Sequence, residues 1–145
     1  MTTPPARILI APGAGAPSSS DWMRGWATRL TAIAPVTPLD YPYALAGRKR
    51  PDRLPVLLDA HRAALDALPE PAEEVALVGK SMGSRVGCHV ALDAPVRALV
   101  CFGYPLVGTG KTRPVRDEVL LALERPILFV GGSRDPLCPL DRLEA

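Results

Sequence analysis

Apolar runs alternate with amphipathic segments along this chain, and that alternation is typical of a parallel β-sheet covered by helices. Short apolar runs at residues 7–11, 74–78, 96–102 and 126–130 are interpreted as strands, and residues 32–37 are expected to hold a further short strand. We therefore predict an α/β fold of three layers, α/β/α, with a mainly parallel sheet of about five strands.

Helical periodicity marks the segments between these runs. The first helix is predicted to begin at Ser20 or Asp21, either of which can cap it. Apolar positions then recur at the spacing of one helical face, and they are Met23, Trp26, Leu30 and Ile33. We interpret the two tryptophans, Trp22 and Trp26, as packing residues of this helix. Further helices are expected over residues 52–68, 82–93 and 115–124, and from residue 140 onward.

Composition and charge indicate a single domain and argue against several classes of function. The 145 residues, 48% of them hydrophobic, fit one domain over residues 1–145. A net charge of +2 gives no case for nucleic-acid binding, and no apolar run approaches the length of a membrane span. The three cysteines follow no metal-ligand spacing, so we expect reduced thiols, no metal and a cytoplasmic location. Nothing indicates a signal peptide or a cofactor site.

The strand at residues 74–78 runs directly into the motif G-x-S-x-G, formed by Gly79, Lys80, Ser81, Met82 and Gly83. This combination is typical of a nucleophile elbow, a sharp strand-to-helix turn that presents its serine outward. The glycines are required because a side chain there would collide with the turn or the neighbouring strand. We therefore predict that Ser81 is a catalytic nucleophile, with an incidental serine turn as the alternative.

Two glycine-containing segments partly match phosphate-binding motifs. The Gly-Lys-Ser of the elbow would need an earlier glycine to open a P-loop, but Glu74 stands at that position. The run that starts at Gly13 partly matches a dinucleotide fingerprint, but Pro17 and Ser18 break the pattern. Both motifs are disfavoured.

The loop after the first strand has a different role in a serine hydrolase, because its backbone N–H groups stabilise the oxyanion. Ala14 N–H and Met82 N–H are the predicted donors, and a plain loop is the alternative. Asp135 follows the last strand, where the acid of a catalytic triad is expected, and a simple Asp-Pro turn is the alternative. Gly13, Lys80 and Tyr104 are predicted to line the substrate pocket.

The general base has no candidate of comparable quality. His89 lies eight residues after Ser81 on the same predicted helix, which places it about 12 Å away along the helix axis. His61 lies on the apolar stripe of an earlier helix and is interpreted as a core residue. No histidine follows residue 89, although the triad order on this fold is serine, acid, histidine.

Five segments together resemble the branch of the α/β-hydrolase superfamily that includes Tex30 and KANL3-like proteins and many small bacterial hydrolases. They are residues 11–16 (APGAGA), 41–43 (YPY), 79–85 (GKSMGSR), 101–106 (CFGYPL) and 131–137 (GGSRDPL). The resemblance implies an α/β-hydrolase sheet with Ser81 as nucleophile and Asp135 as acid. Pro12 stands where the family often has histidine.

In this family the catalytic histidine follows one more strand. The resemblance therefore implies an α/β-hydrolase fold that lacks its last strand and helix, incomplete at the C-terminus. An apolar sheet face and a strand edge would then be exposed, and we expect self-association through that edge or pairing with another chain.

The function expected from these features is a serine hydrolase that acts on a small ester or related acyl substrate. Because the 145 residues supply no triad histidine, little or no turnover is expected from them. The alternative is a non-catalytic interaction module that keeps the hydrolase frame. Neither a membrane nor a nucleic acid is expected as a partner.

Overall fold

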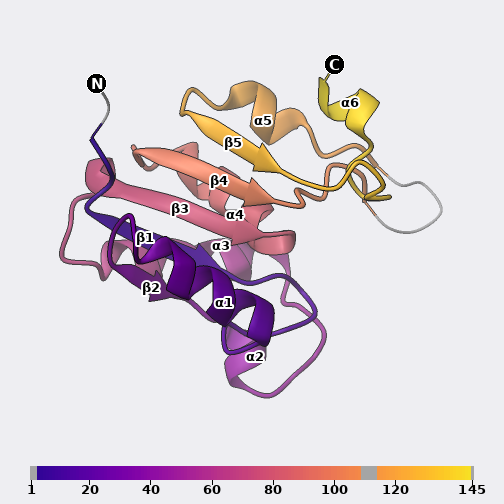
Figure 1. The fold of residues 1–145 in the computed structure, drawn as a ribbon. Coiled ribbons are helices and arrows are strands. Elements are labelled where there is room, and N and C mark those ends of the chain that lie inside the picture. The colour runs from indigo at the N-terminus through magenta and orange to yellow at the C-terminus, as the bar shows by residue number, and fades with distance from the viewer. Residues whose placement is uncertain (1–2, 109–113, 145) are drawn as a thin grey trace.

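The computed structural model describes residues 3–108 and 114–144 and shows one parallel sheet between two layers of helices (Figure 1). The strands lie in the order β2-β1-β3-β4-β5, and every neighbouring pair is parallel. Their bounds are β1 Arg7–Ala11, β2 Val36–Pro38, β3 Val75–Lys80, β4 Ala98–Phe102 and β5 Ile127–Val130. This arrangement confirms the predicted three-layer α/β fold with a five-stranded sheet.

The helices differ more from the sequence-based expectation. Their bounds are α1 Asp21–Leu30, α2 Pro42–Leu45, α3 Leu54–Asp66, α4 Met82–Ala91, α5 Glu118–Ala122 and α6 Leu140–Glu144, with a short 3₁₀ turn at Ala72–Glu74. Helix α1 ends three residues earlier than expected, and Ile33 beyond it is 53% exposed. Helix α2 was not predicted, and α5 is half the expected length. No helix of the described residues is long and apolar enough to span a bilayer.

Side chains on the two faces of the sheet form two separate cores. Because successive strand residues point to opposite faces, Ile8 and Ile10 of β1 lie on one face and Leu9 on the other. The face with Ile8 packs against Met23 of α1, whereas the face with Leu9 packs against Leu57 of α3 and α4. Figure 1 shows α1 in front of the sheet, with α3 and α4 behind it.

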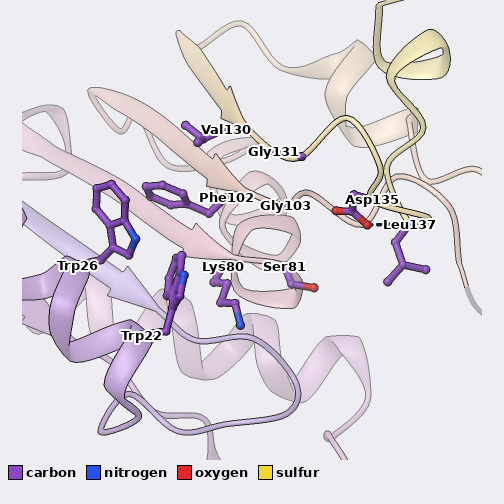
Figure 2. Close-up of a pocket in the computed structure, with 11 residues that line it drawn as sticks. Trp22, Trp26, Lys80, Ser81, Phe102, Gly103, Val130, Gly131, Asp135 and Leu137 are labelled. Atoms are coloured by element: carbon purple, nitrogen blue, oxygen red, sulfur yellow. Dashed lines mark hydrogen bonds between the residues drawn. The ribbon is translucent and has the colours of Figure 1, made fainter.

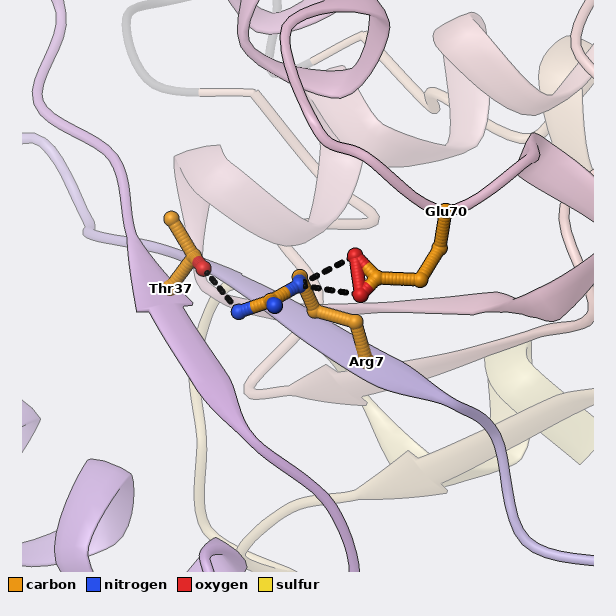
Figure 3. Close-up of polar contacts among 3 residues, drawn as sticks. All are labelled: Arg7, Thr37 and Glu70. Carbon is orange, nitrogen blue, oxygen red and sulfur yellow. Dashed lines mark hydrogen bonds and ion pairs between the residues drawn. The ribbon is translucent and has the colours of Figure 1, made fainter.

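A polar cluster joins segments that are distant in the sequence at the start of β1 (Figure 3). Arg7 Nε lies 2.6 Å from Glu70 Oε1 and 2.8 Å from Oε2, and Arg7 Nη1 donates to Thr37 Oγ1 at 2.9 Å. Arginine suits this position because its planar group can bond a carboxylate and a hydroxyl together. The cluster fixes β1 against β2 and against the segment that follows α3.

The outer part of the sheet on the α1 side is not covered by a helix of the described residues. Register pairs Val100 of β4 with Leu128 of β5, and Phe102 with Val130. Leu128 is 59% exposed and Val130 is 40% exposed. Since α1 packs over β1, β3 and Phe102, the apolar side chains of β5 on this face remain open to solvent.

Candidate active site

Ser81 lies on a strained turn between β3 and α4. Its φ of 49° and ψ of −115° make it the one non-glycine residue with positive φ among the described residues. Such a conformation costs on the order of 1–3 kcal/mol and persists only where the surroundings fix it. Here Ser81 N donates to Phe102 O at 2.7 Å, and Ser84 Oγ donates to Ser81 O at 2.6 Å. The turn is therefore held from the neighbouring strand and from the helix.

The glycines of the motif are required by close backbone contacts. A Cβ on Gly83 would lie 2.6 Å from both Ala11 O and Pro12 O, and a Cβ on Gly79 would lie 2.5 Å from the carbonyl carbon of Gly83. Because both sets of neighbours are backbone atoms, no side-chain movement can relieve these contacts. This geometry gives the physical reason for the G-x-S-x-G spacing and agrees with the predicted nucleophile elbow.

The loop after β1 lies directly against the elbow. A Cβ on Gly13 would be 3.3 Å from Lys80 O and 3.5 Å from Ser81 Cβ. Ala14 O accepts a hydrogen bond from Tyr43 Oη at 3.3 Å, which ties the loop to α2. The strand order 2-1-3-4-5 reverses its direction between β1 and β3, and ligands of open α/β sheets bind at such a point.

A cavity of about 520 Å³ opens beside Ser81, at the carboxyl ends of β3, β4 and β5. Its polar lining includes Lys80, Ser81 and Asp135. Figure 2 shows Ser81 and Asp135 toward one end of this cavity and the rings of Trp22 and Trp26 at the other. The volume is that of a site for a small organic molecule.

Asp135 is held by the loop after β5. Its Oδ1 accepts a hydrogen bond from Leu137 N at 2.9 Å, and its backbone N donates to Gly132 O at 3.2 Å. A Cβ on Gly103 would lie 3.6 Å from Asp135 Oδ2, and Gly103 itself has a φ of 60°. The structure therefore places a carboxylate and the elbow serine in the lining of one cavity.

The apolar end of the cavity is aromatic. Phe102 lies at the end of β4, with its ring centroid 5.3 Å from Trp22 and 4.7 Å from Trp26. Lys80 Nζ lies 5.1 Å from the centroid of the Trp22 ring, which is cation–π geometry. We predicted the tryptophans as packing residues, and they also line the cavity. Their i, i+4 spacing placed them on one helical face, but no sequence signal showed which strand end they would meet.

Neither histidine of the chain lines this cavity. His61 is 1% exposed, its Nδ1 lies 2.9 Å from Tyr41 Oη, and burial lowers its pKa to about 3. This confirms the interpretation of His61 as a core residue. His89 is half-buried on α4 and lines a different cavity; burial, followed by the charge of Arg85, lowers its pKa.

Other predicted site residues lie outside the cavity lining. Tyr104 was expected in the pocket, but it is 1% exposed, and its hydroxyl donates to Arg116 O at 3.0 Å. It is a core residue because its ring also packs edge-on against Phe129, at 6.0 Å between centroids. Ala14 lines a separate cavity of about 270 Å³ next to Tyr43, and Met82 begins α4.

The arrangement agrees with comparisons to known proteins. Three solved structures share the fold at low identity. An α/β serine hydrolase homologue from Coxiella burnetii has 16% identity and a TM-score of 0.72, covering 99% of this chain and 69% of its own. Mouse α/β-hydrolase domain-containing protein 10 has 15% identity and a TM-score of 0.71, with coverage of 99% and 75%. The ydeN gene product of Bacillus subtilis has 16% identity and a TM-score of 0.66, with coverage of 93% and 75%.

A family model described as an alpha/beta hydrolase domain matches residues 4–145. That range includes β3, its neighbours β1 and β4, the loop after β1, and Asp135. The chain is a member of the α/β-hydrolase family.

Proposed function

We propose that this protein is a serine hydrolase that cleaves small esters or related acyl substrates with Ser81 as its nucleophile. The observation that carries the proposal is the strained φ of Ser81 at the edge of a cavity that also contains Asp135. Holding a serine in this conformation has a cost, and on this fold the strained turn serves to present the serine hydroxyl to the substrate.

In the proposed reaction, Ser81 Oγ attacks the acyl carbon and its proton passes to a base. The carbonyl oxygen becomes an oxyanion, which would accept hydrogen bonds from Ala14 N–H and Met82 N–H. Met82 begins α4, so its N–H is one of the groups that a helix leaves unpaired at its first turn. The alcohol then leaves with a proton, and water releases the acyl group from Ser81.

The described residues around the cavity include no histidine that could act as the general base. Asp135 would orient a histidine and stabilise its charged form, but the two histidines of the 145 residues do not line the cavity. Without an added base, hydrolysis by residues 1–145 would then depend on the oxyanion donors and substrate binding alone. In serine proteases that lack a triad member, the oxyanion hole and substrate binding still accelerate acyl transfer by roughly 10³–10⁴ over water.

The aromatic lining indicates the kind of acyl group. Trp22, Trp26 and Phe102 provide an apolar aromatic surface in the same cavity as Ser81, and such surfaces are favourable for short acyl chains or aromatic rings. The five segments at residues 11–16, 41–43, 79–85, 101–106 and 131–137 support placing the protein in the branch with Tex30 and KANL3-like proteins. The alternative, a non-catalytic interaction module, is favoured by the absence of a histidine from the cavity.

The proposal is tested by hydrolysis of p-nitrophenyl acetate and butyrate, with free imidazole added as an external base. We expect a protein-dependent rate that imidazole increases, and Ser81→Ala should abolish this imidazole-dependent increase. Ser133→Ala is the matched control, because Ser133 is exposed in the loop after β5 and is not part of the proposed machinery. An unchanged imidazole-dependent increase in Ser81→Ala would overturn the proposal and favour the interaction module.

A further inference from the structure

A second cavity, of about 400 Å³, lies between α4 and the segment that leads into α5. Its titratable lining consists of Arg85 and His89 from α4, Arg116, and Glu118 at the start of α5. It shares no lining residue with the cavity beside Ser81. The proposed hydrolysis therefore gives no reason for two arginines to line this second cavity.

The Arg85 side chain lacks the partners that a half-buried arginine usually has. Its Nε is buried and has no hydrogen-bond partner in the described residues, and no carboxylate there forms an ion pair with its guanidinium. An unpaired buried donor costs about 1–3 kcal/mol, and arginine cannot lose its proton to avoid that cost. The guanidinium therefore lacks a counter-ion among the described residues, and an anion bound in the cavity would supply one.

Arg116 brings a second guanidinium to the same cavity. Its backbone is fixed on both sides, because its N donates to Leu106 O at 2.6 Å and its O accepts from Tyr104 Oη at 3.0 Å. Burial, followed by the positive charge of Arg116, lowers the pKa of Arg85, so the two cations repel each other. A bound anion would remove this repulsion and satisfy donors on both arginines.

The remaining charged and polar groups at the cavity fit the same ligand. His89 has a lowered pKa, caused by burial and by Arg85, so it is neutral near pH 7 and can donate one hydrogen bond. Glu118 is exposed and is the one acidic group in the lining. Within the described ranges Glu118 forms no ion pair with either arginine, so both guanidinium groups remain available.

We propose that this cavity is a binding site for a small oxyanion, whose carboxylate or phosphate oxygens accept hydrogen bonds from the guanidinium groups of Arg85 and Arg116. Arginine pairs bind both kinds of anion because their forked donors match two oxygens at once. The site is independent of the proposed hydrolase chemistry. A ligand with one anionic group and a small organic body fits a cavity of this size.

The test follows the Nε–Hε resonance of Arg85 in ¹⁵N–¹H spectra during titration with inorganic phosphate and, separately, with succinate, at constant ionic strength. We expect a saturable downfield shift at millimolar or lower concentration. A shift with phosphate alone identifies a phosphoryl ligand, and a shift with succinate alone identifies a carboxylate. Linear shifts that do not saturate, or no shift with either probe, would overturn the proposal.

Variants locate the site. Arg116→Gln should weaken binding roughly tenfold or more, the effect of losing one charge-assisted hydrogen bond, while backbone amide spectra report whether the fold is kept. Arg85→Gln should lose binding, measured through the amide shifts of α4. Arg50→Gln removes the same charge from an exposed loop position and should bind as the wild type does. Equal weakening in Arg50→Gln would show non-specific attraction and contradict the site. Ser81→Ala should bind normally, which separates this proposal from the hydrolase proposal.

Discussion

Lowering the pH should destabilise this protein through the buried imidazole of His61. Its pKa falls from 6.5 to about 3 because burial removes the charged form from water. Between these values the unfolded chain binds a proton that the folded chain does not, so stability is lost as the pH falls through 6.5. Each unit of pKa difference corresponds to about 1.4 kcal/mol, so the loss from pH 7 to pH 5 is about 2 kcal/mol.

The surroundings of His61 support the neutral form. Tyr41 Oη lies 2.9 Å from Nδ1, and burial also raises the pKa of Tyr41, so its hydroxyl stays protonated and can donate to Nδ1. The other ring nitrogen, Nε2, is buried without a partner among the described residues. With Tyr41 donating to Nδ1, the proton of the neutral ring lies on Nε2, so a second proton would have to enter at Nδ1, where it would displace the Tyr41 proton and place a full charge in the core.

The assay is urea unfolding between pH 7 and pH 5, followed by the fluorescence of Trp22 and Trp26. The wild type should lose about 2 kcal/mol more than His61→Gln over this range, because the variant has no group to titrate at this position. His89→Gln is the control and should keep most of the wild-type dependence. Should His61→Gln fail to fold, the Cε1–H resonance of His61 in the wild type gives the same information. A midpoint near pH 6.5 for that resonance, or equal pH dependence in the two proteins, would refute the reasoning.

Further outcomes follow from the elbow, the loop after β1 and the edge strand. Gly83→Ala should destabilise the protein by about 1–3 kcal/mol in urea unfolding, because its Cβ would lie 2.6 Å from two carbonyl oxygens. Gly15→Ala is the control, because a Cβ there would meet no atom within 4 Å, and its free energy of unfolding should differ from that of the wild type by no more than about 0.5 kcal/mol. Ala14→Pro removes one predicted oxyanion donor and should slow ester cleavage by roughly 10²–10³ with the fold retained, a loss that would be absent if Ala14 N–H does not contact the oxyanion. Light scattering should show concentration-dependent self-association through β5, which Leu128→Lys reduces; a monomer at all concentrations would contradict this expectation.

The sheet could be predicted from the sequence because buried parallel strands are short apolar runs with few alternatives. The elbow could also be predicted from the sequence, because Gly79 and Gly83 are required by close contacts with backbone atoms. Helix α2 could not be predicted, because four residues with a proline at the first position carry no helical period. Helix α5 ends at Ala122, since Leu123 is extended ahead of Pro126.

Contacts between side chains that are distant in the sequence were harder to predict. Phe102 joins Trp22 and Trp26 because β4 lies beside β3 and α1 packs over its end, a placement that periodicity alone does not give. Arg85 and Arg116 are separated by thirty residues of sequence, and neither belongs to a motif that predicts an anion site. Tyr104 was misassigned because its position after a strand suggested the pocket, whereas its ring points into the core.

The central claim, that Ser81 is an activated nucleophile, is tested most directly by reaction with a fluorophosphonate in the presence of imidazole, followed by mass-spectrometric mapping of the adduct. The account predicts one phosphonyl group on Ser81, none on Ser81→Ala, and normal labelling of Ser133→Ala. Adducts on other serines with Ser81 unmodified, or no adduct at any residue of the folded protein, would contradict it.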